Sequence, residues 1–288
     1  MIPRSTDGKT RVLALSYGKD SMACLGALEK LQWPLDRIVT ADVWATDTIP
    51  ADPPTMMEFK EYADREILER YGITVEHYSA MDKDGNKVTY NSLFYRGYKP
   101  ETVAKRARAG KKFDYYDPGR VIWGFPVVQG PWCNSGLKVA ALNQAKKATK
   151  DSITIVGIAA DEPIRIERAK KKHQLLPLVE VGWTEADCWK WSEEHGLLSP
   201  TYKQATRGGC WFCHNQSVGQ LRLLRRQYPD LWAMMMEWDN DSPVRFHADG
   251  RTIHDFDRRF QLEDAGLIDP TEPWKWTKLE EELNYRWF

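Results

Sequence analysis

Small polar and charged residues gather in one short run near the N-terminus, Ser16-Tyr17-Gly18-Lys19-Asp20-Ser21. Hydroxyls, an ammonium group and backbone amides bind phosphate, and the glycine permits a sharp turn and a close approach of the backbone to a ligand. The run therefore predicts a cradle for an anion. The alternative is an ordinary turn between a strand and a helix, in which small polar residues only cap the helix.

The residues on either side of this run form the elements that must position it. Residues 12–15 are a short apolar stretch, typical of a buried strand in a parallel sheet. Residues 21–31 have the apolar spacing of an amphipathic helix. A loop between such a strand and the start of a helix has free amides and the positive end of the helix dipole. This context favours phosphate binding over a plain turn.

Strands and helices alternate along most of the chain. Residues 37–44, 74–78 and 152–158 are expected to form strands, and residues 55–71 a helix. This alternation predicts an α/β fold with a doubly wound parallel sheet, whose ligand lies beyond the carboxyl ends of the strands. Because the phosphate-binding run, Asp42 and residues 157–162 each lie at the carboxyl end of a strand, we expect them to meet at one site.

The C-terminal part of the chain has a different pattern. Past Gly182 the apolar spacing is mostly helical, and helices are expected over residues 184–194, 221–238, 253–265 and 278–285. The sequence therefore predicts a nucleotide-binding domain over residues 1–215, which includes all five cysteines, and a mostly helical extension over residues 216–288.

The cysteines include one pair with the spacing of metal ligands. Cys210 and Cys213 are separated by two residues and follow two glycines, so their thiolates can bind one metal ion or cluster. Cys133 and Cys188 would complete a set of four, which suits a tetrahedral Zn²⁺ ion or a [4Fe–4S] cluster. Cys24, on the helix that follows the phosphate-binding run, is expected to be a core residue.

Residues 16–21 resemble the PP-loop, Ser-x-Gly-x-Asp-Ser, of the superfamily of ATP pyrophosphatases and phosphoadenylyl-sulfate (PAPS) reductases. The fold of this superfamily is described as adenine nucleotide alpha-hydrolase-like. The Tyr-Gly-Lys filling is nearest to the sulfonucleotide-reductase branch. Residues 132–138 resemble the family motif of a cysteine followed by a lysine, and residues 157–165 resemble Gly-x4-Glu-x2-Arg. Residues 209–213 add the Cys-x2-Cys in the family order. The resemblance covers residues 11–215 and implies a doubly wound fold with an adenine-nucleotide site.

The resemblance implies which residues bind the nucleotide. Phosphate contacts are implied for the whole loop, Ser16, Tyr17, Gly18, Lys19, Asp20 and Ser21. Asp42 and Gly157 would lie on the nucleotide side of the site. For Asp42 the alternative is a cap at the end of its strand.

Catalytic and metal-binding roles follow from the same resemblance. The implied catalytic residues are Lys19, Asp20, Lys138 and Arg165. Lys138 and Arg165 would face the anionic part of the ligand, and the alternative for each is a surface ion pair. Asp161 or Glu162 would hold Mg²⁺, because polyphosphates usually arrive with this ion and carboxylates complete its shell.

The resemblance also favours iron–sulfur over zinc at the cysteines. Adenylyl-sulfate reductases and several PP-loop tRNA-thiolating enzymes hold a [4Fe–4S] cluster through distant cysteines that include a Cys-x2-Cys. This chain departs from the family because the paired Cys-Cys is here Trp132-Cys133. The fourth ligand must then come from elsewhere, and the candidates are Cys188 and, in reserve, His214. A Zn²⁺ ion and a protein without metal are the alternatives.

A missing thiol separates the candidate reactions. Sulfonucleotide reduction needs a thiol that attacks the sulfate sulfur, and the reductases carry it in a C-terminal Glu-Cys-Gly-Leu-His motif. No cysteine follows Cys213 in this sequence. The sequence therefore favours cleavage of ATP to AMP and pyrophosphate, which would activate an acceptor for sulfur or nitrogen. The alternatives are a PAPS or adenylyl-sulfate reductase, and a non-catalytic nucleotide- and metal-binding module of a larger complex.

Composition limits the expected partners. The 41 lysines and arginines balance 41 acidic residues, so overall charge gives no argument for a nucleic-acid partner. The stretch from Tyr95 to Tyr116 is basic and aromatic, and it either binds a nucleic-acid acceptor or forms a solvated loop. No apolar run reaches the roughly 18 residues of a membrane helix, and the first residues do not resemble a signal peptide. We expect a cytoplasmic protein without a membrane partner, and the oligomeric state stays open.

Overall fold

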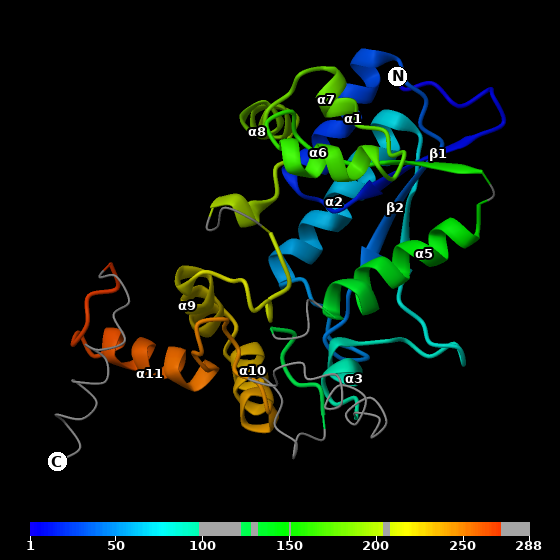
Figure 1. Ribbon diagram of the computed structural model, residues 1–288. Coiled ribbons are helices and arrows are strands. Elements are labelled where there is room, and N and C mark those ends of the chain that lie inside the picture. Colours follow the sequence, from blue (N-terminus) through cyan, green and yellow to red (C-terminus); the bar gives the residue numbers. More distant parts are fainter. Residues whose placement is uncertain (98–121, 128–131, 150, 204–207, 272–288) are drawn as a thin grey trace, which may run out of the picture. The chain divides into compact units, whose positions relative to one another are not determined.

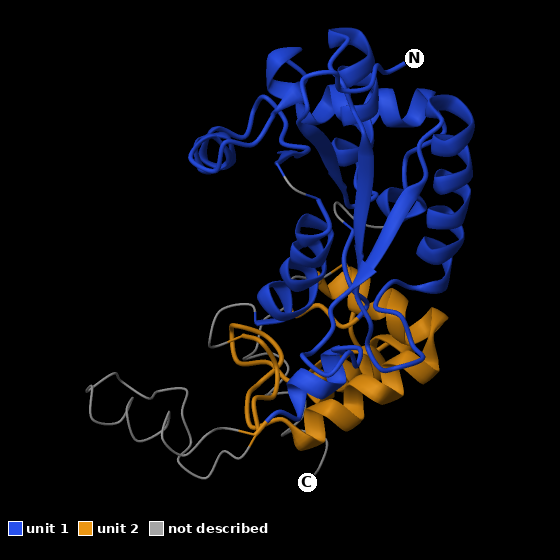
Figure 2. Ribbon diagram, turned by 90° about the vertical axis from the view of Figure 1, so that its right-hand side faces the viewer, with its two compact units in different colours: residues 1–96, 131–211 blue, residues 97–130, 212–288 orange. Residues whose placement is uncertain are grey.

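The computed structural model describes residues 1–97, 122–127, 132–149, 151–203 and 208–271. The chain divides into two compact units (Figure 2). Unit 1 comprises residues 1–96 and 131–211, and unit 2 comprises residues 97–130 and 212–288. Within the described ranges, no helix combines the length and the apolar character needed to cross a membrane.

A four-stranded parallel sheet forms the centre of unit 1 (Figure 1). Its strands are β1 Thr10–Leu15, β2 Arg37–Asp42, β3 Val75–Ser79 and β4 Ser152–Ile155, in the order β3-β2-β1-β4. The predicted α/β class and parallel sheet are confirmed. In β1 the alternation of the strand directs Leu13 and Leu15 into the main core, whereas Val12 packs on the other face with Val39 and Ala145.

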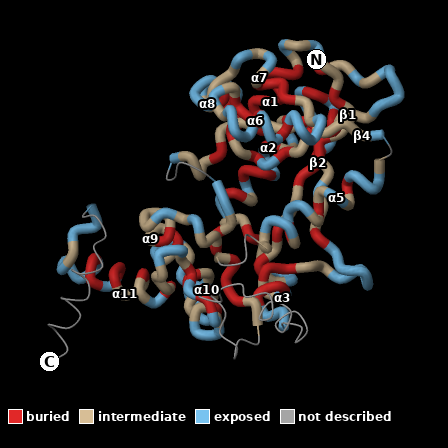
Figure 3. Tube along the Cα trace, viewed as in Figure 1, coloured by how far each residue is buried: buried red, intermediate tan, exposed pale blue. Residues whose placement is uncertain are grey.

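Helices lie on both faces of this sheet. Apolar residues of α1 Lys19–Leu31 and α2 Pro54–Tyr71 pack with Leu13 and Ile38 in the main core. Helices α7 Pro177–Glu180 and α8 Glu185–Glu194 contact α1, which is largely buried (Figure 3). On the opposite face, α5 Ala140–Lys147 contacts β2 and β3. This arrangement is compatible with a doubly wound fold. The strand order reverses between β1 and β4, the place where such sheets bind ligands.

Shorter elements complete unit 1. They are the helices α3 Tyr90–Phe94 and α6 Pro163–Lys170, the π-helix η1 Asn134–Val139 and the 3-10 helix η2 Pro200–Lys203. The helix expected over residues 184–194 is confirmed as α8. The Thr184 hydroxyl accepts a hydrogen bond from the amide of Asp187, and the Asp187 carboxylate accepts one from the amide of Thr184.

In unit 2 the described helices are α9 Val218–Gln227, α10 Pro229–Asp241 and α11 Ile253–Asp264. The single helix predicted over residues 221–238 is wrong. Tyr228 leaves the helical conformation, with φ −134° and ψ 68°, and Pro229 begins a new helix because proline disfavours helical geometry in the residue before it. The helix expected over residues 253–265 is confirmed, and the one expected over residues 278–285 lies outside the described residues.

Unit 2 also contains a segment from the middle of the chain. The prediction placed residues 97–130 inside a domain ending at residue 215. The described part of this segment, residue 97 and residues 122–127, groups with unit 2. Phe125 shows the reason, because its ring packs edge-on against Phe246 at a centroid distance of 5.2 Å. The amide of Phe125 also donates to the hydroxyl of Ser242 at 3.2 Å. Such pairing between distant parts of the sequence cannot be read from the order of elements.

Candidate functional site

The loop between β1 and α1 turns at Tyr17. Tyr17 has φ 57°, in the left-handed region that non-glycine residues rarely adopt, whereas Gly18 is extended with φ −79°. The prediction that the glycine makes the sharp turn is therefore wrong. The Tyr17 side chain is almost completely buried, and its hydroxyl donates to Oδ1 of Asp64 at 2.6 Å. Burial of the ring and this hydrogen bond hold the strained turn in place.

Two serines close this loop around the start of α1. The Ser21 hydroxyl lies 3.1 Å from the Ser16 hydroxyl, accepts the Ser16 amide at 3.1 Å and donates to the Gly18 carbonyl at 2.9 Å. Helix α1 begins without a side-chain cap. Its first-turn amides after Lys19 and the positive end of its dipole are therefore available for an anion.

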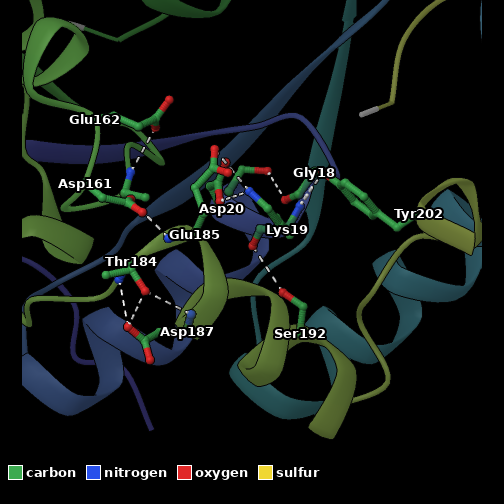
Figure 4. A network of polar contacts seen from close by, with 12 residues as sticks. Gly18, Lys19, Asp20, Asp161, Glu162, Thr184, Glu185, Asp187, Ser192 and Tyr202 are labelled. Atoms are coloured by element: carbon green, nitrogen blue, oxygen red, sulfur yellow. Dashed lines mark hydrogen bonds and ion pairs between the residues drawn. The ribbon is translucent and has the colours of Figure 1, made fainter. Parts of the chain in front are cut away.

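Tyr202, on η2, lies against the same loop. Its hydroxyl accepts a hydrogen bond from the amide of Lys19 at 3.2 Å, so an oxygen occupies one of the amides that would donate to a phosphate (Figure 4). A methyl group added at Gly18 would lie 3.3 Å from that hydroxyl. Nothing in the sequence indicated that Tyr202 contacts the loop.

The Lys19 side chain faces carboxylates. Its ammonium group lies 2.8 Å from Asp20 and 3.5 Å from Glu185 (Figure 4). Burial opposes the charged form most strongly, but the hydrogen bond to Asp20 and the charges of Asp20 and Glu185 together outweigh it, so the pKa of Lys19 is raised. Lys19 is absent from the described residues that line the cavity beside the loop, whereas Asp20 is among them. The charge of this lysine is thus compensated within the protein.

Three carboxylates meet beside Lys19. Oxygen atoms of Asp20, Glu162 and Glu185 all lie within 4.8 Å of one another. Carboxylate oxygens are the ligands that Mg²⁺ prefers, so the donor set fits this ion. Asp161 is outside the group, because its carboxylate accepts the amide of Glu185 at 3.1 Å (Figure 4). Of the two carboxylates that the sequence left open for Mg²⁺, the geometry therefore favours Glu162.

A cavity of about 460 Å³ opens at the carboxyl ends of β1, β2 and β4, where the strand order reverses. Its size lies within the usual range of small-molecule sites. The loop contributes every residue from Ser16 to Ser21 except Lys19. The other polar or charged residues of the lining are Thr40, Asp52, Lys60, Lys138, Arg165, Ser199, Thr201, Tyr202 and Cys210.

Gly157 links the end of β4 to the phosphate-binding loop. A Cβ atom at this position would lie 2.7 Å from backbone atoms of Asp20 and Ser21, closer than side chains approach backbone. Gly157 also lines the cavity. Only glycine therefore lets the β4 end support the loop, which agrees with the predicted place of Gly157 at the site.

The cations of the cavity wall differ in how far they are compensated. Arg165 is paired with Glu162 at 2.5 Å, and Lys60 is paired with Asp52 at 2.7 Å and Asp42 at 3.2 Å. Among the described residues Lys138 makes no ion pair. It lies on η1, and short π-helical turns occur frequently at functional sites. Of the three cations that line the cavity, Lys138 is therefore the one whose charge no described side chain compensates.

Asp42 does not line the cavity, although Ala41 and Val43 on either side of it do. Its carboxylate contacts Nδ1 of His77 at 2.9 Å and Nζ of Lys60 at 3.2 Å. The structure therefore gives Asp42 a supporting position behind the wall. Sequence reasoning missed His77 and Lys60, because neither belongs to a motif. The pairing of β3 with β2 brings His77 to Asp42, and the packing of α2 on the sheet brings Lys60.

The four predicted cysteine ligands occupy different surroundings. Cys188 is fully buried in the core between α1 and α8, where burial raises the pKa of its thiol to about 12. This position does not support a role for Cys188 as a ligand. Cys133 and Cys210 lie in unit 1 and Cys213 in unit 2. Within neither unit do the described residues bring three sulfur ligands within 4.8 Å of one another.

The basic and aromatic stretch predicted to bind a nucleic acid falls almost wholly outside the described residues, from residue 98 onward. Its first residue, Tyr95, follows α3 and packs edge-on against Phe94 at 4.9 Å.

No protein-family model matches the sequence, and no curated protein matches it. The function must therefore be inferred from the chemistry of the site.

Proposed function

We propose that this protein binds ATP in the cavity beside the β1–α1 loop and cleaves it to AMP and pyrophosphate to activate an acceptor. One observation carries the proposal: the start of α1 opens into a cavity at the reversal of strand order. Beside it lie a group of three carboxylates and Lys138, which forms no ion pair with any described residue. The resemblance of residues 16–21 to a PP-loop supports an adenine nucleotide as the ligand.

In the proposed reaction, an oxygen of the acceptor attacks the α-phosphorus and the bond to the bridging oxygen of the β-phosphate breaks. Pyrophosphate leaves and the acceptor becomes adenylated, so that sulfur or nitrogen can then displace AMP. The amides of α1 and the charges of Lys138 and Arg165 would stabilise the negative charge on the phosphates. Asp20, Glu162 and Glu185 would hold Mg²⁺, which supplies further neutralisation of the phosphate charge.

The Lys138→Ala variant tests this proposal through ATP affinity in the presence of Mg²⁺, measured by calorimetry on the full chain. We expect about tenfold weaker binding, because one charged contact to phosphate is lost. Lys147→Ala is the matched control, since Lys147 is an exposed lysine at the end of α5 and does not line the cavity. Equal affinity of both variants and the wild type, or turnover to ADP, would contradict the proposal. Tight ATP binding without turnover would instead support the module without catalysis.

Reduction of a sulfonucleotide is the second candidate, and Cys210 is the observation that favours it. This cysteine lines the cavity, so a thiol lies beside the proposed nucleotide site. Attack of a thiol on the sulfate sulfur would release the nucleotide and leave an S-sulfocysteine, from which a second thiol would free sulfite. Release of sulfite from PAPS or adenylyl-sulfate in the presence of a dithiol, lost in Cys210→Ser, would establish this reaction in place of ATP cleavage.

The acceptor is proposed to be a nucleic acid bound through the basic and aromatic stretch from Tyr95 to Tyr116. The charge and aromatic content of that stretch support the proposal. Binding of a tRNA or DNA oligonucleotide should then weaken steeply as salt rises. An affinity that does not change with salt would remove the nucleic acid from the proposal.

A further inference from the structure

A chain of polar contacts leads from the phosphate-binding loop into the sheet. The Tyr17 hydroxyl donates to Oδ1 of Asp64, on α2, at 2.6 Å. Oδ2 of Asp64 lies 3.0 Å from Nε2 of His77, on β3, and Nδ1 of the same ring lies 2.9 Å from Asp42 at the end of β2. The imidazole ring of His77 on β3 thereby connects α2 with the end of β2.

The chain continues from Asp42 to the cavity wall. Nζ of Lys60 lies 3.2 Å from Asp42 and 2.7 Å from Asp52, and it sits 5.1 Å above the ring of Tyr17. Lys60 is almost completely buried, but it lines the cavity, as do Tyr17 and Asp52. The two ends of this polar network therefore contact the proposed ligand space, whereas its centre, Asp64, His77 and Asp42, lies behind it.

We propose that Asp64 and His77 are positioning residues for nucleotide binding, which hold the phosphate-binding loop through Tyr17 and hold Lys60 at the cavity wall through Asp42. The inference rests on the proposed function, because it takes the ligand of this loop to be a nucleotide. It goes beyond that function by assigning a role to residues that do not touch the ligand.

The strained backbone of Tyr17 makes the conformation of the loop depend on the network. A tyrosine at φ 57° is less stable than one in the extended or helical region, so the loop keeps this turn only while its side chain is anchored. Loss of the hydroxyl contact to Asp64 would let Tyr17 relax. The amides of Gly18 and Lys19, which follow directly, would then leave their positions at the start of α1.

The charges of the network require a protonated imidazole. Both ring nitrogens of His77 face carboxylates, and only the imidazolium form donates from both. The hydrogen bonds to Asp42 and then to Asp64 raise the pKa of His77 to about 9. The groups around the ring are these two carboxylates and the Tyr17 hydroxyl at 3.4 Å. Lys60 contacts the carboxylate of Asp42 and not the ring itself. The network is therefore closed at neutral pH and loses its central charge as the pH rises through about 9.

The test measures ATP affinity between pH 7 and pH 10 for the wild type and the variants His77→Gln, Asp64→Asn and Tyr17→Phe. We expect the wild type to bind about tenfold more weakly above pH 9, and each variant to bind about tenfold more weakly at pH 7. His77→Gln should show no step near pH 9. The double variant Asp64→Asn/Tyr17→Phe should bind ATP no more weakly than whichever single variant has the lower affinity, because both changes break the same contact.

Glu76→Gln is the matched control, because Glu76 is the neighbour of His77 on β3 and pairs with Arg37 at 2.5 Å, away from the network. It should keep the wild-type affinity and the step near pH 9. The proposal would be overturned if all three variants kept the wild-type affinity for ATP. It would also be overturned if the loss of affinity in the double variant equalled the product of the losses in the two single variants.

A second measurement separates this proposal from the proposed function. In the nucleotide-free protein, the NMR amide signal of Gly18 should follow the titration of the His77 ring, and Asp64→Asn should abolish this coupling. If the coupling is present but the wild type binds no ATP, the proposed function fails and the network stands as a support of the loop alone. If ATP binds and the Gly18 signal ignores His77, the positioning role fails.

Discussion

Each unit contains a network of charged side chains, and the two networks differ in how far they are buried and in what lies next to them. In unit 2, Glu263 is fully buried and accepts Arg222 at 2.5 Å and Arg259 at 2.6 Å. None of its members lines the described cavity. In unit 1, the network of Asp64, His77 and Lys60 ends at the cavity wall. Buried charge by itself therefore indicates stability, and it indicates function only where it reaches a space for a ligand.

The largest expected effect is the loss of stability in Glu263→Ala. Burial opposes the ionised carboxyl, but Arg222 and Arg259 outweigh it and lower the pKa of Glu263. The substitution removes the buried carboxylate that Arg222 and Arg259 share, which should lower the free energy of unfolding by about 3 kcal/mol. Urea denaturation measures this change. ATP affinity should stay at the wild-type value, and a parallel loss of affinity would break the distinction between the two networks.

The next effect is expected at Gly157, which supports the loop from the end of β4. Gly157→Ala places a methyl group 2.7 Å from the backbone of Asp20 and Ser21, so the loop must shift. We expect ATP to bind about thirtyfold more weakly, equivalent to about 2 kcal/mol of overpacking. Gly219→Ala is the control in unit 2, because a methyl group there meets only ordinary contacts. Unchanged affinity in Gly157→Ala would show that the loop does not bind the nucleotide.

A smaller effect should appear in the pH dependence of stability. The pKa of His77 is raised from 6.5 to about 9, so its contribution is complete below pH 6.5 and is lost as the pH rises through about 9. Because the ring is 37% exposed, solvent screening reduces the contribution to roughly 1 kcal/mol. Unfolding measured across this range should show the decline in the wild type and not in His77→Gln. An identical decline in both proteins would remove His77 as its source.

The smallest effect concerns the thiol in the core of unit 1. Cys188→Ala removes one buried sulfur atom and should lower the free energy of unfolding by about 1 kcal/mol. It should leave the iron and zinc content of anaerobically purified protein unchanged. A loss of metal in this variant would return Cys188 to the predicted ligand set, whereas an unchanged metal content would agree with its position in the core.

The sequence predicted the elements of unit 1 well, because their signals are local. The apolar run of residues 12–15 and the helical spacing of residues 21–31 are set by neighbours in the chain. The same holds for the capping pair at the start of α8. The break at Pro229 could have been predicted from the proline itself, but the apolar spacing continued across it.

The candidate site was predictable only in part. Gly157, Lys138, Arg165 and the loop residues other than Lys19 belong to motifs and do line the cavity. The polar network was not predictable, because Asp64 and His77 meet only after α2 packs on the sheet. The turn was also assigned to the wrong residue, since the sequence does not show that a buried hydrogen bond stabilises a tyrosine in the left-handed region.

One titration tests the central claim most directly. ATP with Mg²⁺ is added to ¹⁵N-labelled protein while the amide signals of the loop and of unit 2 are followed. The account predicts large shifts for Gly18, Asp20 and Ser21, and none for residues of α11 such as Phe260. Binding of ATP that leaves these loop amides unshifted would contradict it.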